Sequence, residues 1–102
     1  MPRRPSRRIF GFRLVDDELA GLPLRVQVHF IELVARLGEG IPPADDVWEI
    51  LGHRIRVYST EAGMTTYRIG FEMMPEGWLM LWGCGSPTVF RRRLTRRLNR
   101  IG

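Results

Sequence analysis

Apolar residues repeat first at every second position, then at helical spacing, and then at every second position again. From Ile9 the alternation predicts a strand whose apolar face carries Phe10, Phe12 and Leu14. Residues 24–37 follow Pro23 and precede Gly38, and their helical spacing of apolar residues predicts an amphipathic core helix. The stripe of this helix consists of Val26, Phe30, Leu33, Val34 and Leu37.

The polar residues of the first half fit this scheme as caps and surface positions. The acidic run at residues 16–18 lies where acids favour the start of a helix, so we interpret it as capping rather than catalytic. His29 lies beside the apolar stripe and is predicted to be a partly buried packing residue. Asp45 and Asp46 are predicted to cap a short turn. That turn carries Val47, Trp48 and Ile50.

Three further strands and a final helix are predicted in the second half. The strands cover residues 53–59, 65–74 and 78–84, and the last one is apolar on both faces, as expected of a central strand. Ser86 and Pro87 are predicted to be the N-cap and the first position of the helix. The helix presents a core stripe of Phe90, Leu94, Leu98 and Ile101. Its six arginines are expected to face outward.

The order of elements is a strand, a helical hairpin, a three-stranded meander and a basic terminal helix. It predicts a single α+β domain over residues 9–102. Residues 1–8 combine arginine, proline and serine without periodicity, so we expect a flexible basic arm there. The 102 residues, 44% of them apolar, are enough for one hydrophobic core and no more.

Charge is distributed unevenly along the chain. All sixteen basic residues are arginine, with four in residues 1–8 and six in residues 91–102. The other six share residues 9–90 with all eleven acidic residues, so the ends carry +10 and the middle −5. Arginine pairs bidentately with phosphate or carboxylate. The asymmetry therefore points to nucleic acid first, or to an anionic membrane or an acidic protein.

Several classes of protein find no support in the sequence. The longest apolar run covers residues 78–82, far below the ~20 of a membrane span, and no signal peptide is visible, so we expect a cytoplasmic protein. Motifs such as HExxH, CxxC and GxSxG are missing, and we expect neither a metal nor a cofactor. The stretch Gly83-Cys84-Gly85-Ser86 is predicted to be a tight structural turn rather than a phosphate site.

The charged residues of the second half carry the candidate chemistry. Arg54 and Arg56 share one face of a predicted strand, and Arg68 lies on the next strand, with Tyr58 and Tyr67 near them in sequence. One explanation is neutralisation by surface ion pairs. The available acids are Glu49, Glu61 and Glu72. The other explanation is a concavity that binds phosphates while the aromatic rings stack on bases.

The same segments resemble the RelE/ParE/HigB superfamily of bacterial type II toxins over about residues 9–101. The shared pattern is Asp-Asp-Glu-Leu, Gly-Leu-Pro, a helix, and strands that begin near His53, Tyr67 and Trp78. The resemblance implies an N-terminal strand and a helical hairpin packed on a twisted antiparallel sheet, followed by a basic helix. It also implies a cytoplasmic toxin that cleaves messenger RNA on the ribosome without a metal and inhibits translation.

The resemblance assigns roles to individual residues. The basic-apolar-basic pattern of one family strand falls on Arg54 and Arg56, and the Tyr-Arg pair of the next falls on Arg68, so these three are the implied catalytic residues. The expected RNA contacts and proton carriers of the sheet are His53, Tyr58 and Tyr67. The final helix adds three expected RNA contacts, Arg91, Arg92 and Arg96. The implied partners are RNA, the ribosome and an acidic antitoxin, with any oligomer formed through the antitoxin and no membrane involved.

Two departures leave a second function open. RelE-like nucleases usually carry Gly-Lys-Arg or Gly-His-Arg after the last strand, where this chain has Gly-Cys-Gly-Ser, and the active tyrosine of some members falls on Phe90. A different registration aligns Trp48-Glu49-Ile50 with the HigB-like branch and places Arg54 and Arg56 in an insertion. The alternative is a non-catalytic protein of the same fold, either a gyrase inhibitor or an RNA- or protein-binding phage or chromosomal protein.

Overall fold

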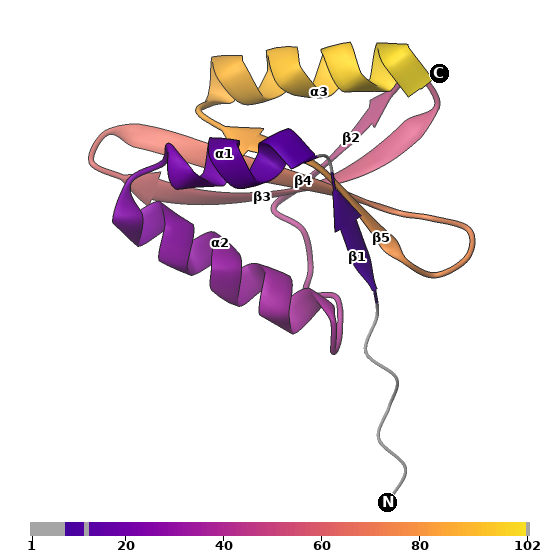
Figure 1. The fold of residues 1–102 in the computed structure, drawn as a ribbon, viewed down its shortest axis with the longest axis horizontal. Helices are drawn as coiled ribbons and strands as arrows, with labels where there is room; N and C mark the ends of the chain where they lie inside the picture. Colours follow the sequence, from indigo (N-terminus) through magenta and orange to yellow (C-terminus); the bar gives the residue numbers. More distant parts are fainter. Residues whose placement is uncertain (1–7, 12, 102) are drawn as a thin grey trace, which may run out of the picture.

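Five strands form one mixed sheet with three helices in the computed structural model, which describes residues 8–11 and 13–101 (Figure 1). The strands are β1 (Ile9–Gly11), β2 (Asp46–Ile50), β3 (His53–Ala62), β4 (Thr65–Met73) and β5 (Leu79–Gly85). The helices are α1 (Arg13–Ala20), α2 (Leu24–Leu37) and α3 (Pro87–Ile101). The chain is therefore of the α+β class, as predicted.

The sheet has the order β1-β5-β4-β3-β2, so the first strand of the chain lies beside the last. β1 is parallel to β5, with Ile9 opposite Leu79, and the other neighbouring strands are antiparallel. The predicted meander of residues 53–84 is confirmed as β3, β4 and β5. Because β5 lies between β1 and β4, it is an inner strand, as its two apolar faces predict.

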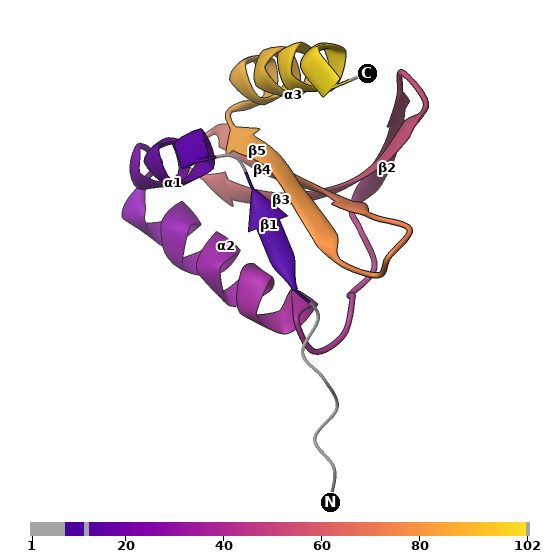
Figure 2. The same ribbon diagram turned by 45° about the vertical axis from the view of Figure 1, so that its right-hand side comes forward.

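Each face of the sheet carries its own hydrophobic cluster. One cluster joins α1 and α2 to the sheet, and its largest fully buried members are Phe30, Leu37, Ile69, Phe71 and Leu79. The other joins α3 to the opposite face and comprises Ile55, Val57, Trp82, Phe90, Leu94 and Leu98. Figure 2 shows α2 and α3 on opposite sides of the sheet. Since successive side chains of a strand point to opposite faces, the same strands supply both clusters.

α2 and α3 pack by the predicted stripes. In α2 the buried residues are Val26, Phe30, Leu33 and Leu37, while Val34 is half-buried. α3 begins at Pro87, and the N–H of Phe90 donates to the carbonyl of Ser86 at 2.7 Å. The buried residues of α3 include Phe90, Leu94 and Leu98, each fully inaccessible. The side chain of Ile101 lies outside the described part of the structure.

Three local predictions for the first half are wrong. The segment after Asp45 is the strand β2 instead of a capped turn, because Trp48 and Ile50 alternate onto the α3 face and pack there. The described part of the first strand is Ile9–Gly11, and residue 14 belongs to α1, which begins at Arg13, while Phe12 lies outside the described residues. His29 is exposed rather than packed, because it points away from the sheet.

Arg8 is the only residue of the predicted basic arm that the structure describes. Its carbonyl accepts the N–H of Leu79 at 2.9 Å, which holds it at the start of β5. The rest of the arm, residues 1–7, lies outside the described residues. Within the described part, none of the helices has the length and apolar character that crossing a membrane requires.

Candidate nucleic-acid interface

An open groove of about 750 Å³ runs along α3 and is lined by arginine. Its cationic lining comes from Arg68 of β4 and from Arg91, Arg92 and Arg96 of α3. The remaining lining residues are Pro87, Thr88, Thr95 and Asn99. Positions 88, 91, 92, 95, 96 and 99 follow one another at helical spacing, so a single face of α3 forms the wall. Hydroxyl and amide groups therefore stand between the cations along this face.

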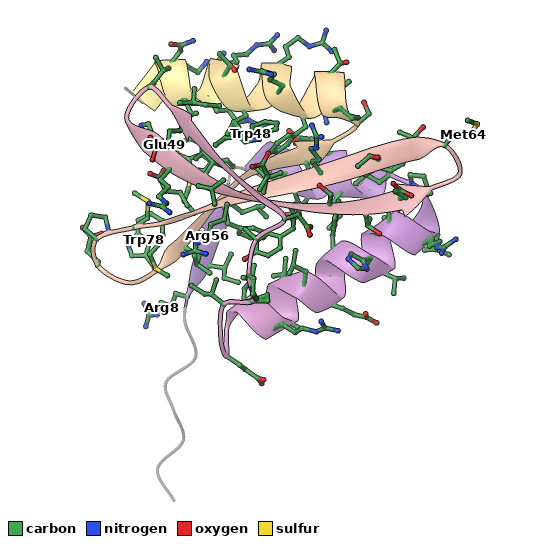
Figure 3. All side chains as sticks on the ribbon, turned by 180° about the vertical axis from the view of Figure 1, so that it is seen from behind. Arg8, Trp48, Glu49, Arg56, Met64 and Trp78 are labelled. Carbon is green, nitrogen blue, oxygen red and sulfur yellow. The ribbon has the colours of Figure 1, made fainter. Side chains whose placement is uncertain are left out.

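Trp48 holds two of these cations together. The guanidinium of Arg68 lies 5.4 Å from the centre of its ring, and that of Arg91 lies 5.6 Å away. The indole N–H donates to Asp46 Oδ2 at 2.9 Å, and the ring packs on Phe90 with a centroid distance of 5.4 Å. Figure 3 shows Trp48 beside α3. The ring face attracts cations, which offsets part of the repulsion between the two guanidinium groups.

The arginines of the groove have no acidic partner among the residues that the structure describes. None of the four lies within salt-bridge distance of a carboxylate in the described part of the chain. Arg92 and Arg96 are four residues apart on one helix, where like charges destabilise by a few tenths of a kcal/mol. Because arginine stays charged at any physiological pH, the groove carries four uncompensated positive charges. Such a surface is suited to an anionic ligand.

Two arginines of α3 turn inward instead, so the prediction that all six face outward is wrong. Arg97 forms an ion pair with Glu18 of α1, and both residues are only 9% exposed. Arg97 also donates to the carbonyl of Trp82 at 2.8 Å, and Arg93 donates to the carbonyl of Cys84 at 3.0 Å. Glu18 is therefore a buried pairing residue and not the surface capping residue that its sequence position predicts.

The length of β1 explains this ion pair. β1 ends opposite Leu81, so the last residues of β5 have no strand neighbour on that side. Glu18 Oε2 accepts a hydrogen bond from the N–H of Cys84 at 3.4 Å, and Arg97 donates to the carbonyl of Trp82. The ion pair therefore bonds the backbone groups of β5 that a neighbouring strand would otherwise bond. A Cβ atom at Gly83 would lie 2.8 Å from the Arg97 guanidinium. The glycines predicted to form a turn thus lie in β5, where one of them leaves room for Arg97.

The three predicted catalytic arginines do not share a surface. Arg56 lies opposite Phe71 in the β3–β4 register, which places it and Arg54 on the α1 and α2 side of the sheet. Arg68 lies on the α3 side, against Trp48. Figure 3 shows Arg56 on the side of the sheet away from α3. The prediction of one concave surface is wrong, because the sequence does not reveal which residues of β3 and β4 pair.

Ion pairs do not neutralise Arg54, Arg56 or Arg68 in the described residues. Glu49 is the cross-strand neighbour of Arg54, yet the two do not come within salt-bridge distance. Glu72 binds other partners, because its carboxylate accepts hydrogen bonds from the His53 ring and the Trp82 indole. The explanation by surface ion pairs is therefore not supported.

The predicted proton carriers are held by other contacts. His53 Nδ1 lies 2.9 Å from Glu72 Oε1, and its ring packs edge-on against Trp82. Tyr58 is 5% exposed and donates its hydroxyl to the carbonyl of Pro42 at 2.8 Å, and burial raises the pKa of this phenol. Tyr67 is half-buried against the α1 and α2 cluster. These three residues do not line the groove.

Sequence reasoning missed five residues of the groove region, namely Trp48, Pro87, Thr88, Thr95 and Asn99. The helical spacing of the last three with Arg91, Arg92 and Arg96 is visible in the sequence and would have found them. Trp48 carries no such signal, because its contacts depend on the pairing of β2 with β3. No group of metal-ligating side chains occurs in the described part of the chain. No known protein-family model matches the sequence, and no curated protein is significantly similar to it.

Proposed function

We propose that this protein binds single-stranded RNA through the groove along α3. The observation that carries the proposal is the set of four uncompensated arginines on one groove, Arg68, Arg91, Arg92 and Arg96. Successive turns of a helix lie about 5.4 Å apart, so Arg92 and Arg96 present two cations about one turn apart along the groove. Positively charged grooves that follow the backbone are the usual platform for single strands, and Trp48 contacts two of the arginines of this groove.

Binding fits the groove better than catalysis does. RNA cleavage needs a proton carrier near the scissile phosphate, in addition to groups that hold the charge. The groove supplies arginine, threonine and asparagine, and none of these titrates near neutral pH. Of the two functions that the sequence leaves open, the non-catalytic one therefore has the better support.

The second candidate is the ribosome-dependent endoribonuclease of a toxin–antitoxin system. Two observations favour it. The described elements follow the arrangement that the resemblance to RelE-like toxins implies, and Arg54 and Arg56 share one face without an acidic partner. In this second proposal, the two arginines would bind the phosphate on the side of the sheet opposite to α3.

Fluorescence anisotropy with a short labelled single-stranded RNA tests the two proposals against each other. We expect Arg92→Gln/Arg96→Gln to weaken binding roughly tenfold per arginine, because a hydrogen bond to a charged group contributes about 1.5 kcal/mol. Arg54→Gln/Arg56→Gln removes the same charge from the opposite face and serves as the matched control, with little expected change.

Equal weakening by both variants would contradict a specific groove, because it would reflect net charge alone. Cleavage of messenger RNA in a purified translation system, lost in Arg54→Gln/Arg56→Gln but kept in the groove variant, would favour the second candidate. Intact messenger RNA at protein concentrations that saturate the labelled RNA supports the first.

A further inference from the structure

α2 carries a second apolar stripe that faces solvent. Leu24, Val28 and Ile31 are 74%, 47% and 54% exposed, and Ala35 is exposed as well. These four residues, which we call the outer seam, lie at intervals of four, three and four. The core stripe of α2 has the same intervals two residues further on. At about 100° per residue the two stripes lie on nearly opposite sides of the helix.

We propose that the outer seam is a dimer interface, in which α2 packs antiparallel against α2 of a second copy of this chain. Intervals of four and three are the a and d positions of a heptad repeat, the pattern by which two helices interlock. A twofold axis midway along the seam would place Leu24 against Ala35 of the second copy, and Val28 against its Ile31. The outer seam of one copy then covers the outer seam of the other, because a twofold interface uses the same surface of both copies.

The charges beside the outer seam select this partner and this orientation. Arg25 and Glu32 are both exposed and occupy equivalent flanking positions one heptad apart. In an antiparallel pair these positions face each other, so Arg25 meets Glu32 of the second copy, and the twofold axis repeats the pair. On the other side of the outer seam, Gln27 of one copy lies against Val34 of the second copy, and neither residue is charged. A parallel pair would instead place Glu32 beside Gln27 and leave Arg25 without a partner.

The neighbouring contacts leave the outer seam free to pack. The Gln27 side chain donates to the carbonyls of Ala20 and Leu22, which fixes the turn between α1 and α2. A pair of fourteen-residue helices lies at the small end of specific interfaces, below about 1,200 Å². We therefore expect a reversible dimer that forms in the micromolar range and dissociates on dilution.

Sedimentation equilibrium of the full chain, free of RNA, tests the interface independently of the proposed function. Ile31→Glu would place two carboxylates, one from each copy, in the middle of the apolar interface. We expect the dissociation constant of the dimer to rise more than about a hundredfold. Met64→Glu changes a fully exposed side chain at the β3–β4 turn and serves as the matched control (Figure 3). A wild-type chain that stays monomeric at millimolar concentration overturns the proposal, as does an unchanged dimer in Ile31→Glu.

A charge exchange tests the orientation. Arg25→Glu and Glu32→Arg should each weaken the dimer, because like charges then meet at both ends, while the double variant should recover it. If both single variants weaken the dimer and the double variant does not restore it, the antiparallel pairing is contradicted. A second check mixes the Val28→Cys and Ile31→Cys proteins under mild oxidation. Antiparallel packing predicts that a Val28→Cys chain forms a disulfide with an Ile31→Cys chain faster than two copies of either variant do. The buried Cys84 adds little background.

Discussion

α2 and α3 bury the same kind of stripe and expose opposite kinds of surface. Each helix packs leucine and phenylalanine against one face of the sheet, at the spacing that its sequence predicts. The outer side of α2 carries Leu24, Val28 and Ile31, whereas the outer side of α3 carries Arg91, Arg92 and Arg96. The inner stripes therefore explain the fold, and the outer sides carry the surfaces of the two proposed interactions, one apolar and one cationic.

The largest effect is expected where the two helices are alike. Phe30→Ala in α2 and Phe90→Ala in α3 each remove a fully buried ring, and each should lower the free energy of unfolding by about 3–5 kcal/mol. Urea denaturation followed by circular dichroism measures both. A loss below about 1 kcal/mol in only one of them would mean that the two helices do not contribute equally to the fold.

The buried ion pair between α1 and α3 should rank next. Glu18→Gln leaves the Arg97 guanidinium without its counter-charge and should lower the free energy of unfolding by about 3 kcal/mol. Glu18→Gln/Arg97→Gln removes both charges and keeps an acceptor and a donor for the Cys84 N–H and the Trp82 carbonyl, so it should cost clearly less. Denaturant unfolding of the two variants decides the point, and equal losses would mean that packing volume rather than charge holds the two helices together.

Cys84 lies beside that ion pair and provides a pH probe. Burial and the nearby Glu18 raise the pKa of its thiol from 9.0 to about 12. The unfolded chain therefore releases this proton at lower pH than the folded chain does. The contribution of the protonated Cys84 thiol to the free energy of unfolding is complete below pH 9, and it is lost as the pH rises toward 12. Unfolding free energies measured across this window should fall more steeply for the wild type than for Cys84→Ala, and parallel curves would contradict the shift.

The smallest effect on stability is expected on the outer side of α3. Arg92→Gln/Arg96→Gln should leave the free energy of unfolding unchanged within about 0.5 kcal/mol, or raise it slightly, because a repulsive pair is removed. RNA binding should respond much more clearly. Each lost phosphate contact should reduce the slope of log affinity against log salt by roughly 0.7. Titrations at several salt concentrations measure that slope, and an unchanged slope would exclude contacts of these two arginines with phosphate.

Local patterns suffice to predict most helices and strands and the α3 wall of the groove, whereas the pairing between strands could not be predicted. α2 was predicted with the bounds that the structure shows, because Pro23 and Gly38 flank an unbroken stripe. Strand β2 was missed, because its five residues begin at the second of two aspartates that follow two prolines, and they carry too little alternation to distinguish a strand from a turn. Its identity depends on pairing with β3, which is a long-range contact.

The candidate site shows the same limit. That Arg54 and Arg56 share a face follows from a period of two, and the sequence suffices for it. The position of Arg68 depends on the register that sets Ser59 opposite it, which places it on the other face. The inward turn of Arg97 depends on where β1 ends, at Gly11, which is 86 residues earlier in the sequence (97 − 11). Sequence periodicity places Arg97 beside the core stripe of α3, three residues after Leu94 and seven after Phe90, but it does not reveal Glu18 as the partner.

An NMR titration of the isotope-labelled protein with a short single-stranded RNA tests the division between the two helices most directly. The three tryptophan indole signals report separate places, because Trp48 lies at the groove while Trp82 is buried and Trp78 packs on Phe10. We predict shifts at Trp48 and at the backbone of Thr88, Thr95 and Asn99, with none along the outer seam of α2. Shifts along α2, or around Arg54 and Arg56 with α3 unaffected, would contradict the account.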